Sequence, residues 1–396
     1  MRFLLAPDSF KECMSARRAA DAMAAGVLAA LPDAVCDRAP MSDGGEGLVD
    51  AMLVALAARG VTATVTGPLG QPVDASYGYL DRDRLAIIEV AAAAGLGLLP
   101  PIRRDARLAT TRGVGELIGH ALDLGAERIV VGLGGTATND AGAGMLQALG
   151  ARLTDVAGRD LPPGGAELAR LRAIDLSGLD PRLGSVRFEL ASDVTNVLLG
   201  EHGASRVFGP QKGASAAEVA ELDSALATFA AVARRLLGRP IEDLPGAGAA
   251  GGLGSAFLGF LGAGFDRGVE VVGRAIRLEE RIASADVVLT GEGSIDAQTL
   301  LGKVPLGVAT LAARHNVPVI GFGGRIGGGA GKLLDRGFLA LVPSTPRAVD
   351  PPTALREGPR NLERAVAEIC GGLRRGRRGR DGRCAISVKW EPARPG

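Results

Sequence analysis

Aromatic residues and cysteines are both scarce in this chain. Only 3% of its 396 residues are aromatic, whereas 59 are glycine and 47% are hydrophobic. Its cores must therefore be built from closely packed Ala, Leu and Val, with many backbone positions free to turn or to approach a ligand. The four cysteines lie far apart and show no CxxC or Cys/His spacing. This pattern indicates neither a disulfide framework nor a zinc site and predicts a reducing, cytoplasmic compartment.

The chain also lacks a charge excess and a long apolar run. A formal net charge of +1 provides no global field to attract nucleic acid or an anionic membrane. The apolar run at residues 3–6 is too short for a signal peptide, and no stretch approaches the ~18 apolar residues that span a bilayer. We therefore expect a small-molecule substrate, no nucleic acid and no membrane, while a homo-oligomer stays open.

Lysine is rare relative to arginine. Only five of the 45 Lys plus Arg residues are lysine, and Lys11, Lys212 and Lys303 all occupy short polar segments that contain glycine. A surface that needs only positive charge has no reason to prefer lysine, whereas a loop that holds a compact ammonium against phosphate or carboxylate does. The placement predicts a chemical role for these three residues.

The length favours two domains, and the local patterns indicate an α/β fold. A buried strand at residues 1–6 precedes a helix capped by Ser15, and a helix capped by Thr111 precedes a strand at residues 128–133. Alternating apolar residues at 73–79, a polar turn and a second apolar run at 85–90 predict a hairpin, which is foreign to a purely parallel sheet. We therefore predict a discontinuous α/β domain (residues 1–60 plus 286–373), an inserted domain (61–285) and a basic, disordered tail (374–396).

A glycine turn after the strand at residues 128–133 is the strongest local signal. The segment 130–140 leads from this apolar strand through Gly134 and Gly135 into an expected helix start, where free backbone amides favour an anion. Thr136 and Thr138 can donate hydroxyl hydrogen bonds, and Asp140 can hold a magnesium ion directly or through water.

A second glycine-rich segment lies at residues 246–254. Its spacing satisfies GxGxxG, but no strand precedes it, so the pattern is weak evidence for a dinucleotide. A loop that presses on substrate or nucleotide stays open, and Gly252 is a candidate for substrate binding.

Carboxylates recur in glycine-bearing segments at the expected strand ends. They are Asp8, Asp43, Glu46, Asp193, Glu292 and Asp296. Together with three motif lysines and no Ser/His/Asp or Cys/His arrangement, they favour phosphoryl transfer, which needs metal-holding carboxylates, cations and a base on the acceptor hydroxyl. Parallel strands present such residues at one edge of a sheet.

Six segments in this order closely resemble the motifs of the bacterial type 1 glycerate kinases: residues 6–11, 42–47, 132–140, 193–196 with 208–214, 246–254 and 290–303. The resemblance covers about residues 1–372. It implies ATP-dependent, Mg²⁺-dependent phosphorylation of D-glycerate, most often to 2-phosphoglycerate. It also implies a discontinuous Rossmann-like α/β domain from both chain ends with an inserted flavodoxin-like α/β domain. The chain departs from the family at two motifs. The family usually reads Lys-Gly-Ser-Leu-Ser where this chain has Lys11, Glu12, Cys13, Met14 and Ser15, and it usually has proline at the position of Val197.

The resemblance and the residue chemistry together give these expected roles. Gly134, Gly135, Thr136, Asn139 and Asp140 bind the nucleotide. Lys11, Lys212 and Lys303 contact the transferred phosphoryl group or the glycerate carboxylate, and Asp8, Ser9 and Gly252 bind substrate. Asp43, Glu46 and Glu292 hold magnesium, and either Asp193 or Asp296 is the base. The site should lie in the cleft between the two domains, whose closure would exclude water.

Three alternatives stay open. The same kinase could form 3-phosphoglycerate or act on a related hydroxy acid. A hydroxy-acid dehydrogenase would use the Gly246 segment to bind a nicotinamide. A nucleotide-binding regulator would bind ATP and leave it intact.

Overall fold

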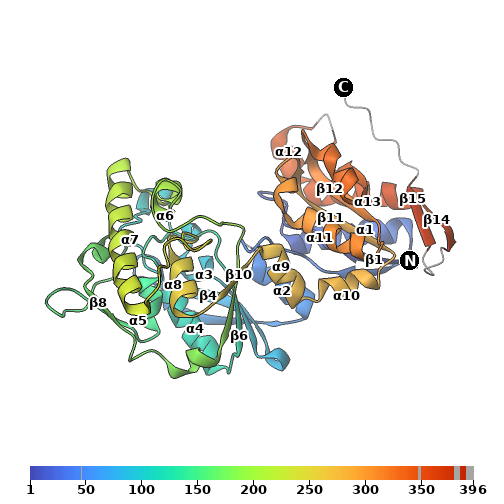
Figure 1. Ribbon diagram of the computed structural model, residues 1–396. Coiled ribbons are helices and arrows are strands. Elements are labelled where there is room, and N and C mark those ends of the chain that lie inside the picture. Colours follow the sequence, from blue (N-terminus) through green and yellow to red (C-terminus); the bar gives the residue numbers. More distant parts are fainter. Residues whose placement is uncertain (46, 347–348, 379–383, 389–396) are drawn as a thin grey trace. The chain divides into compact units, whose positions relative to one another are not determined.

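A computed structural model describes residues 1–45, 47–346, 349–378 and 384–388 (Figure 1). Its contacts group the chain into two compact units. Unit 1 comprises Met1–Asp43, Asp50–Ala57 and Val272–Gly396, and unit 2 comprises Gly44–Val49 and Ala58–Val271. The chain passes from unit 1 to unit 2 at Ala58, close to the predicted boundary at Gly60. It passes back to unit 1 at Val272, 14 residues before the predicted boundary at Asp286. The domain boundaries themselves stay a prediction.

Unit 1 contains a parallel five-stranded sheet. The strand order is β13-β12-β11-β1-β2. Phe3, Leu4 and Leu5 of β1 are fully buried, as expected for a strand with neighbours on both sides in a parallel sheet. The strands are β1 (Arg2–Leu5), β2 (Val35–Arg38), β11 (Val287–Ile295), β12 (Val319–Ile326) and β13 (Phe338–Pro343).

Helices from both chain ends pack in unit 1. A Cβ at Gly26 of α1 would lie 2.3 Å from the carbonyl oxygen of Glu363 in α13, so this glycine lets the two helix backbones touch. As predicted, Ser15 caps α1, and its hydroxyl accepts a hydrogen bond from the Arg18 N–H. Two helices, α2 (Leu48–Leu56) and α9 (Gly268–Ala275), have residues in both units. The other helices of unit 1 are α1 (Ala16–Ala30), α10 (Leu278–Ala283), α11 (Val304–Arg314), α12 (Pro351–Arg356) and α13 (Gly358–Gly372).

The basic C-terminal segment is partly ordered, which differs from the expectation of disorder. Strands β14 (Leu373–Arg378) and β15 (Cys384–Val388) pair in antiparallel fashion. Backbone pairing explains how such a polar sequence forms strands. The remainder of the predicted tail lies outside the described residues.

Unit 2 contains a mixed six-stranded sheet with the order β10-β9-β6-β5-β4-β3. The predicted hairpin is confirmed: β4 and β5 are antiparallel and are joined by a 3-10 turn at Asp81–Asp83. With the parallel sheet of unit 1, this confirms the α/β class. The strands are β3 (Arg59–Thr66), β4 (Pro72–Leu80), β5 (Leu85–Glu89), β6 (Arg128–Gly132), β9 (Arg187–Ala191) and β10 (Gly264–Asp266).

The helices of unit 2 follow their sequence signals closely. The predicted capping box of α7 is present between Ser215 and Glu218, and Gly238 ends the helix in a left-handed conformation with φ +69°. The helices are α3 (Ala91–Ala94), α4 (Arg112–Asp123), α5 (Ala143–Ala148), α6 (Ala204–Phe208), α7 (Ala216–Leu237) and α8 (Leu253–Phe260).

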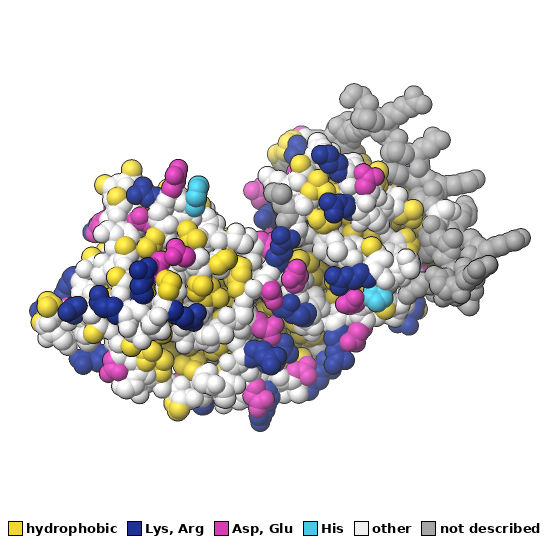
Figure 2. Space-filling model, in the orientation of Figure 1, with side chains coloured by type: hydrophobic (Ala, Val, Ile, Leu, Met, Phe, Trp, Pro, Cys, Tyr) yellow, Lys and Arg dark blue, Asp and Glu magenta, His cyan; other side chains and the backbone are white. Residues whose placement is uncertain are grey.

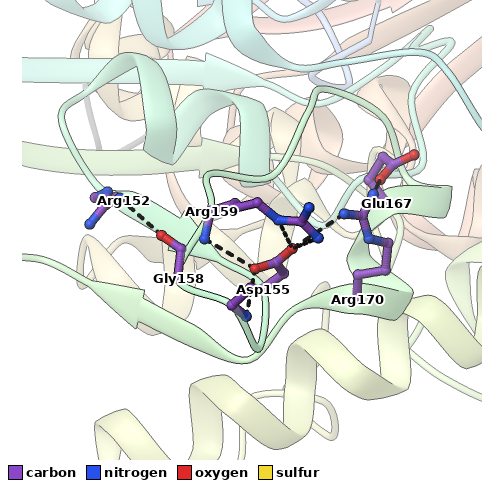
Figure 3. Close-up of polar contacts among 7 residues, drawn as sticks. Arg152, Asp155, Gly158, Arg159, Glu167 and Arg170 are labelled. Carbon is purple, nitrogen blue, oxygen red and sulfur yellow. Dashed lines mark hydrogen bonds and ion pairs between the residues drawn. The ribbon is translucent and has the colours of Figure 1, made fainter.

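A small antiparallel pair in unit 2, β7 (Arg152–Thr154) and β8 (Ala173–Asp175), carries a closed polar network (Figure 3). The buried carboxylate of Asp155 accepts hydrogen bonds from the N–H groups of Ala157 and Arg159 at 2.8 and 3.0 Å. The guanidinium groups of Arg159 and Arg170 donate to its other oxygen. These donors, above all the Arg159 N–H, lower the pKa of Asp155 to about 2.

The charge distribution on the surface and the state of the cysteines agree with what the composition predicts. Figure 2 shows positive and negative side chains interspersed on the face in view. In the described part of the chain, Cys13, Cys36 and Cys370 are free thiols. None of the helices described is both long and apolar enough to cross a membrane.

Candidate active site

Strands β5, β6 and β9 end together at one edge of the unit 2 sheet. Their register pairs Glu89 with Gly132, and Gly132 with Ala191. Because the strands are in step, the glycine turn after Gly132 and Asp193 after Ala191 leave the sheet at neighbouring positions. Ligands of open α/β sheets bind outside this carboxyl edge. The structure thus brings two of the predicted groups together.

The stretch Gly44–Val49 crosses the same edge. A Cβ at Gly44 would lie 2.2 Å from the Ala191 carbonyl oxygen, and one at Gly132 would lie 2.7 Å from the Gly44 carbonyl oxygen. The Val49 N–H donates to a carboxylate oxygen of Glu89 at 2.7 Å. Glycine is therefore required where this motif passes over the strand ends. Glu46, a predicted magnesium ligand in the same motif, lies outside the described residues.

The glycine turn at Gly134 and Gly135 contains backbone N–H groups that no acceptor in the described part of the protein uses. Gly135 is exposed and adopts φ +71°. Within the described residues, the N–H groups of Gly134 and Gly135 donate to no protein acceptor. Two successive free N–H groups in such a turn can bind an oxyanion. The predicted helix start is wrong, because α5 begins only at Ala143 and residues 136–140 run as a buried non-helical segment.

Lys212 is buried against this segment. Its side chain is buried, with 2% of the residue exposed, and its ammonium donates to the Thr138 carbonyl oxygen at 2.6 Å. A longer contact of 3.4 Å reaches the Thr136 hydroxyl. Burial lowers the pKa of Lys212 to about 7, and the nearby Asp140 charge opposes that shift. The contacts favour a role in holding the segment in shape.

Asp140 is likewise engaged inside the protein. Its carboxylate accepts hydrogen bonds from the Thr111 N–H and hydroxyl at 2.8 and 2.9 Å, and from the N–H groups of Gly142 and Gly144 at 3.2 Å. Burial raises its pKa, and these donors oppose the shift. Four internal donors make Asp140 a brace for the segment and leave little capacity for a ligand.

Asn139 connects the same segment to α6. Its amide nitrogen donates to the Ser205 hydroxyl at 2.9 Å. In the part of the chain that is described, the amide oxygen of Asn139 and the hydroxyl of Thr138 are buried without a hydrogen-bond partner. Buried polar atoms without partners are uncommon, and together with the free N–H groups of the turn they fit a site that binds a polar ligand such as ATP.

The glycines of residues 246–254 pack against protein. A Cβ at Gly248 would lie 2.1 Å from the Val197 carbonyl oxygen, and one at Gly251 would lie 1.9 Å from the Thr138 carbonyl oxygen. Gly252 caps α8 with φ +89°, where a Cβ would approach Leu198 to 2.7 Å. Close packing therefore explains these glycines, and the segment supports the turn region from within.

Unit 1 gathers carboxylates at the ends of β1 and β11. The Asp8 N–H donates to the carbonyl oxygen of Gly291 at 2.8 Å. Asp8 therefore lies next to Gly291, which directly precedes Glu292. Asp8 is buried, and its carboxylate accepts a hydrogen bond from the Ser9 N–H at 2.7 Å. Burial, and then the charges of Asp43 and Glu292, raise the pKa of Asp8 to about 7.

Lys11 lies exposed in a tight turn after Asp8. The turn closes through hydrogen bonds between Phe10 and Met14, and the Phe10 N–H donates to the Met14 carbonyl oxygen at 2.9 Å. Glu12, where the resembling family has glycine, adopts φ +62°. A non-glycine residue in this left-handed region is strained.

Glu292 forms an ion pair with Lys303. The distance is 3.3 Å, and the Thr299 hydroxyl donates to the other carboxylate oxygen at 2.6 Å. Burial raises the pKa of Glu292, whereas hydrogen bonds from the Gln298 N–H and the Ser294 hydroxyl help lower that of Asp296. Glu292, Asp296 and Lys303 thus lie together in unit 1.

The acidic residues of unit 1 have donor chemistry that suits magnesium. The charges of Asp43 and Glu292 raise the pKa of Asp8, and a cation would compensate this excess of negative charge. Among the described residues, no group of three or more His, Cys, Asp or Glu side chains is arranged to hold a metal ion. Mg²⁺ commonly takes only one or two protein carboxylates, with substrate phosphates and water as its other ligands.

Three supporting residues were not predicted as site residues. Thr111 binds Asp140, Ser205 binds Asn139, and Thr299 binds Glu292. Thr299 lies within the 290–303 motif, so its place in that motif could have identified it as a site residue. Thr111 was identified only as a helix cap, and its hydroxyl contacts a residue 29 positions away instead.

Comparison with known proteins identifies close relatives. Residues 3–374 match the model of the glycerate kinase family. The chain is 46% identical to a glycerate kinase of Bacillus subtilis over 94% of this chain and 98% of the relative. It is 49% identical to a glycerate 2-kinase of Escherichia coli over 86% and 90%, respectively.

A solved structure shows the same fold. It is a crystal structure from Salmonella typhimurium LT2, of a protein assigned as a glycerate kinase 2. The TM-score is 0.83 at 48% identity, with 93% of this chain and 96% of that chain covered.

Proposed function

Because this chain belongs to the glycerate kinase family and is a glycerate kinase, we propose that it transfers the γ-phosphoryl group of ATP to the 2-hydroxyl of D-glycerate, giving 2-phosphoglycerate. The regiochemistry is supported by 49% identity to the E. coli glycerate 2-kinase. ATP as co-substrate follows from the family. Mg²⁺ and a cytoplasmic location are parts of the proposal.

The glycine turn of unit 2 would bind the nucleotide phosphates. The N–H groups of Gly134 and Gly135 are the donors, and the exposed, left-handed Gly135 allows a phosphate to approach the backbone. Lys212, Asn139 and Asp140 hold the turn from inside through their contacts with Thr138, Ser205 and Thr111. Such pre-organisation supplies electrostatic stabilisation without reorganisation cost during transfer.

We propose Asp193 as the base that accepts the proton of the substrate hydroxyl. It is exposed, it follows the strand next to the glycine turn, and the Gly268 N–H orients its carboxylate at 3.2 Å. The alternative, Asp296, has a lowered pKa. A carboxylate with a lowered pKa accepts a proton less readily and is the weaker candidate.

The polar residues of the other motifs would serve the anionic groups and the metal. Lys11 and Lys303 are the proposed cations, and Asp8 and Ser9 are the proposed substrate contacts. Asp43, Glu46 and Glu292 are the residues that would hold Mg²⁺. A bound Mg²⁺ would neutralise charge on the phosphates. Without a metal ion, the ammonium group of Lys303 offsets the charge of Glu292.

Product analysis tests the proposal. Purified protein is incubated with ATP, MgCl₂ and D-glycerate, and the product is identified by phosphorus NMR, with an EDTA control for the metal. We expect 2-phosphoglycerate, lost with Lys11→Ala and retained with Lys332→Ala, an exposed lysine outside the motifs. A 3-phosphoglycerate signal would contradict the regiochemistry, and no phosphorylated product from a folded, ATP-binding protein would contradict glycerate as substrate.

A further inference from the structure

Arg104 has an unusual environment in unit 2. It follows the 3-10 turn Pro101–Arg103, and its side chain is partly buried. Its Nε is buried and has no hydrogen-bond partner among the described residues. Its Nη1 makes a single long contact, 3.5 Å from the Gln211 carbonyl oxygen. Its guanidinium therefore retains most of its donor capacity.

Three other arginines of unit 2 are paired with carboxylates. Arg107 contacts Glu221 at 3.1 Å, and Arg112 contacts Glu116 at 3.0 Å. Arg128 contacts Glu189 at 2.9 Å, and Arg107 and Arg128 each also have a buried Nε without a hydrogen bond but keep a carboxylate partner. In the part of the chain described, Arg104 lies within 4.0 Å of no carboxylate oxygen. The adjacent Asp105 is used locally and accepts a hydrogen bond from the Arg107 N–H.

The backbone of Arg104 packs against the turn that carries Lys212. A Cβ at Gly213 would lie 2.4 Å from the Arg104 carbonyl oxygen, and Gly213 avoids this clash while adopting φ +92°. Lys212 ends the 3-10 turn Pro210–Lys212 and binds Thr138 behind the glycine turn. Arg104 is thus attached to the same framework that shapes the glycine turn.

Removing part of a guanidinium from water without pairing it costs free energy. The planar fork of arginine donors matches phosphate and carboxylate oxygens, often through two parallel hydrogen bonds. Both co-substrates carry such oxyanions. An anionic ligand would supply the acceptors that the protein does not provide.

We propose that Arg104 binds an oxyanion of a substrate, either a phosphate group of ATP or the carboxylate of D-glycerate. This inference rests on the proposed function and adds a binding residue to it. The two sources share one chemistry, and separate measurements with each substrate distinguish them.

The test compares Arg104→Gln with Arg103→Gln, which removes the same charge from an adjacent exposed residue. Binding of ATP and of D-glycerate is measured separately by calorimetry, and KM for each is measured at saturation of the other. We expect at least about a tenfold weaker affinity for one substrate in Arg104→Gln, partial retention in Arg104→Lys, and wild-type values in Arg103→Gln. The weakened substrate identifies the oxyanion.

A purely structural role is separated by chemical rescue. Ethylguanidinium added to Arg104→Ala should recover part of the lost affinity, because it replaces the missing donors, whereas a distorted turn would not respond. Equal affinities in Arg104→Gln and Arg103→Gln would overturn the inference. An inactive wild-type protein would overturn the proposed function instead, and calorimetry with ATP and with D-glycerate would still report on Arg104.

Discussion

The β7–β8 loop and the end of β1 each bury an aspartate, with opposite consequences. Asp155 and Asp8 are only 5% and 7% exposed, yet the pKa of Asp155 is lowered to about 2 and that of Asp8 is raised to about 7. N–H groups and two guanidinium groups surround Asp155, whereas Asp8 has two carboxylates nearby. Hydrogen-bond donors, above all the Arg159 N–H, lower the pKa of Asp155, whereas burial first, and then the charges of Asp43 and Glu292, raise that of Asp8.

The difference separates a structural carboxylate from those of the candidate site. The network around Asp155 is satisfied within the protein, so it contributes to stability. Around Asp8, the charges of Asp43 and Glu292 raise the pKa, as expected where ligands and metal complete the environment. Substitutions in the two regions should therefore affect different properties.

The largest expected effect is on turnover at the strand ends. Asp193→Asn should lower kcat by roughly 10²–10⁴-fold, because the amide cannot accept the substrate proton. Thermal stability should stay close to wild type, since Asp193 is exposed. Steady-state kinetics check this, with Asp155→Asn as the control that keeps its kcat. A kcat within threefold of wild type in Asp193→Asn would remove Asp193 from the mechanism.

The second effect is a gain in stability when Asp8 is replaced. A raised pKa means that the folded state favours protonated Asp8. The stability that the protonated carboxyl contributes to the fold is complete below the unfolded pKa of 3.8 and is lost as pH rises through about 7. At pH 8, Asp8→Asn should therefore unfold at a higher denaturant concentration than wild type. Its free energy of unfolding should be larger by up to about 4 kcal/mol. The measurement is chemical denaturation in EDTA from pH 4 to 9. The gain should vanish near pH 4, and a constant gain would show that ionisation is not its cause.

The third effect has the opposite sign and sharpens the contrast. The lowered pKa of Asp155 stabilises the fold above pH 3.8, and this contribution is lost as pH falls through about 2. Asp155→Asn should lower Tm by a few degrees at pH 7, because the amide accepts fewer hydrogen bonds, with little change in kcat. Scanning calorimetry measures it. A stabilised Asp155→Asn protein would mean that the network is not satisfied as described.

The smallest effect concerns backbone strain near Asp8. Glu12→Gly should stabilise the protein by about 1 kcal/mol, since glycine adopts φ +62° without steric cost. Glu12→Ala is the matched control, because it removes the charge and keeps the Cβ. If both variants gain equally, charge rather than strain is responsible.

Local signals in the sequence predicted local structure well. The Ser15 cap, the Ser215–Glu218 capping box and the hairpin at β4–β5 each depend on residues close in the chain. The motifs likewise located the polar residues at strand ends. These features require no knowledge of distant partners.

Long-range packing accounts for what the sequence could not predict. Lys212 looked like a ligand contact, but its ammonium is buried against Thr138, 74 residues away. The glycines at 248 and 251 satisfy a dinucleotide spacing that was weak evidence from the sequence, and in the structure they make room for the carbonyls of Val197 and Thr138. The helix expected after Gly135 is absent because residues 136–140 are held by these distant contacts instead.

The order of the strands in unit 1 has a consequence for synthesis on the ribosome. β1 and β2 emerge first, but β11, the other neighbour of β1, follows roughly 250 residues later. At about 5–20 residues per second, this delay is on the order of 10–50 s. During that time the apolar strand β1 lacks one of its two sheet neighbours, and unit 2 is completed before unit 1. Chaperone demand should therefore be set by the N-terminal strands, and a circular permutant that starts at unit 2 should shorten the exposure.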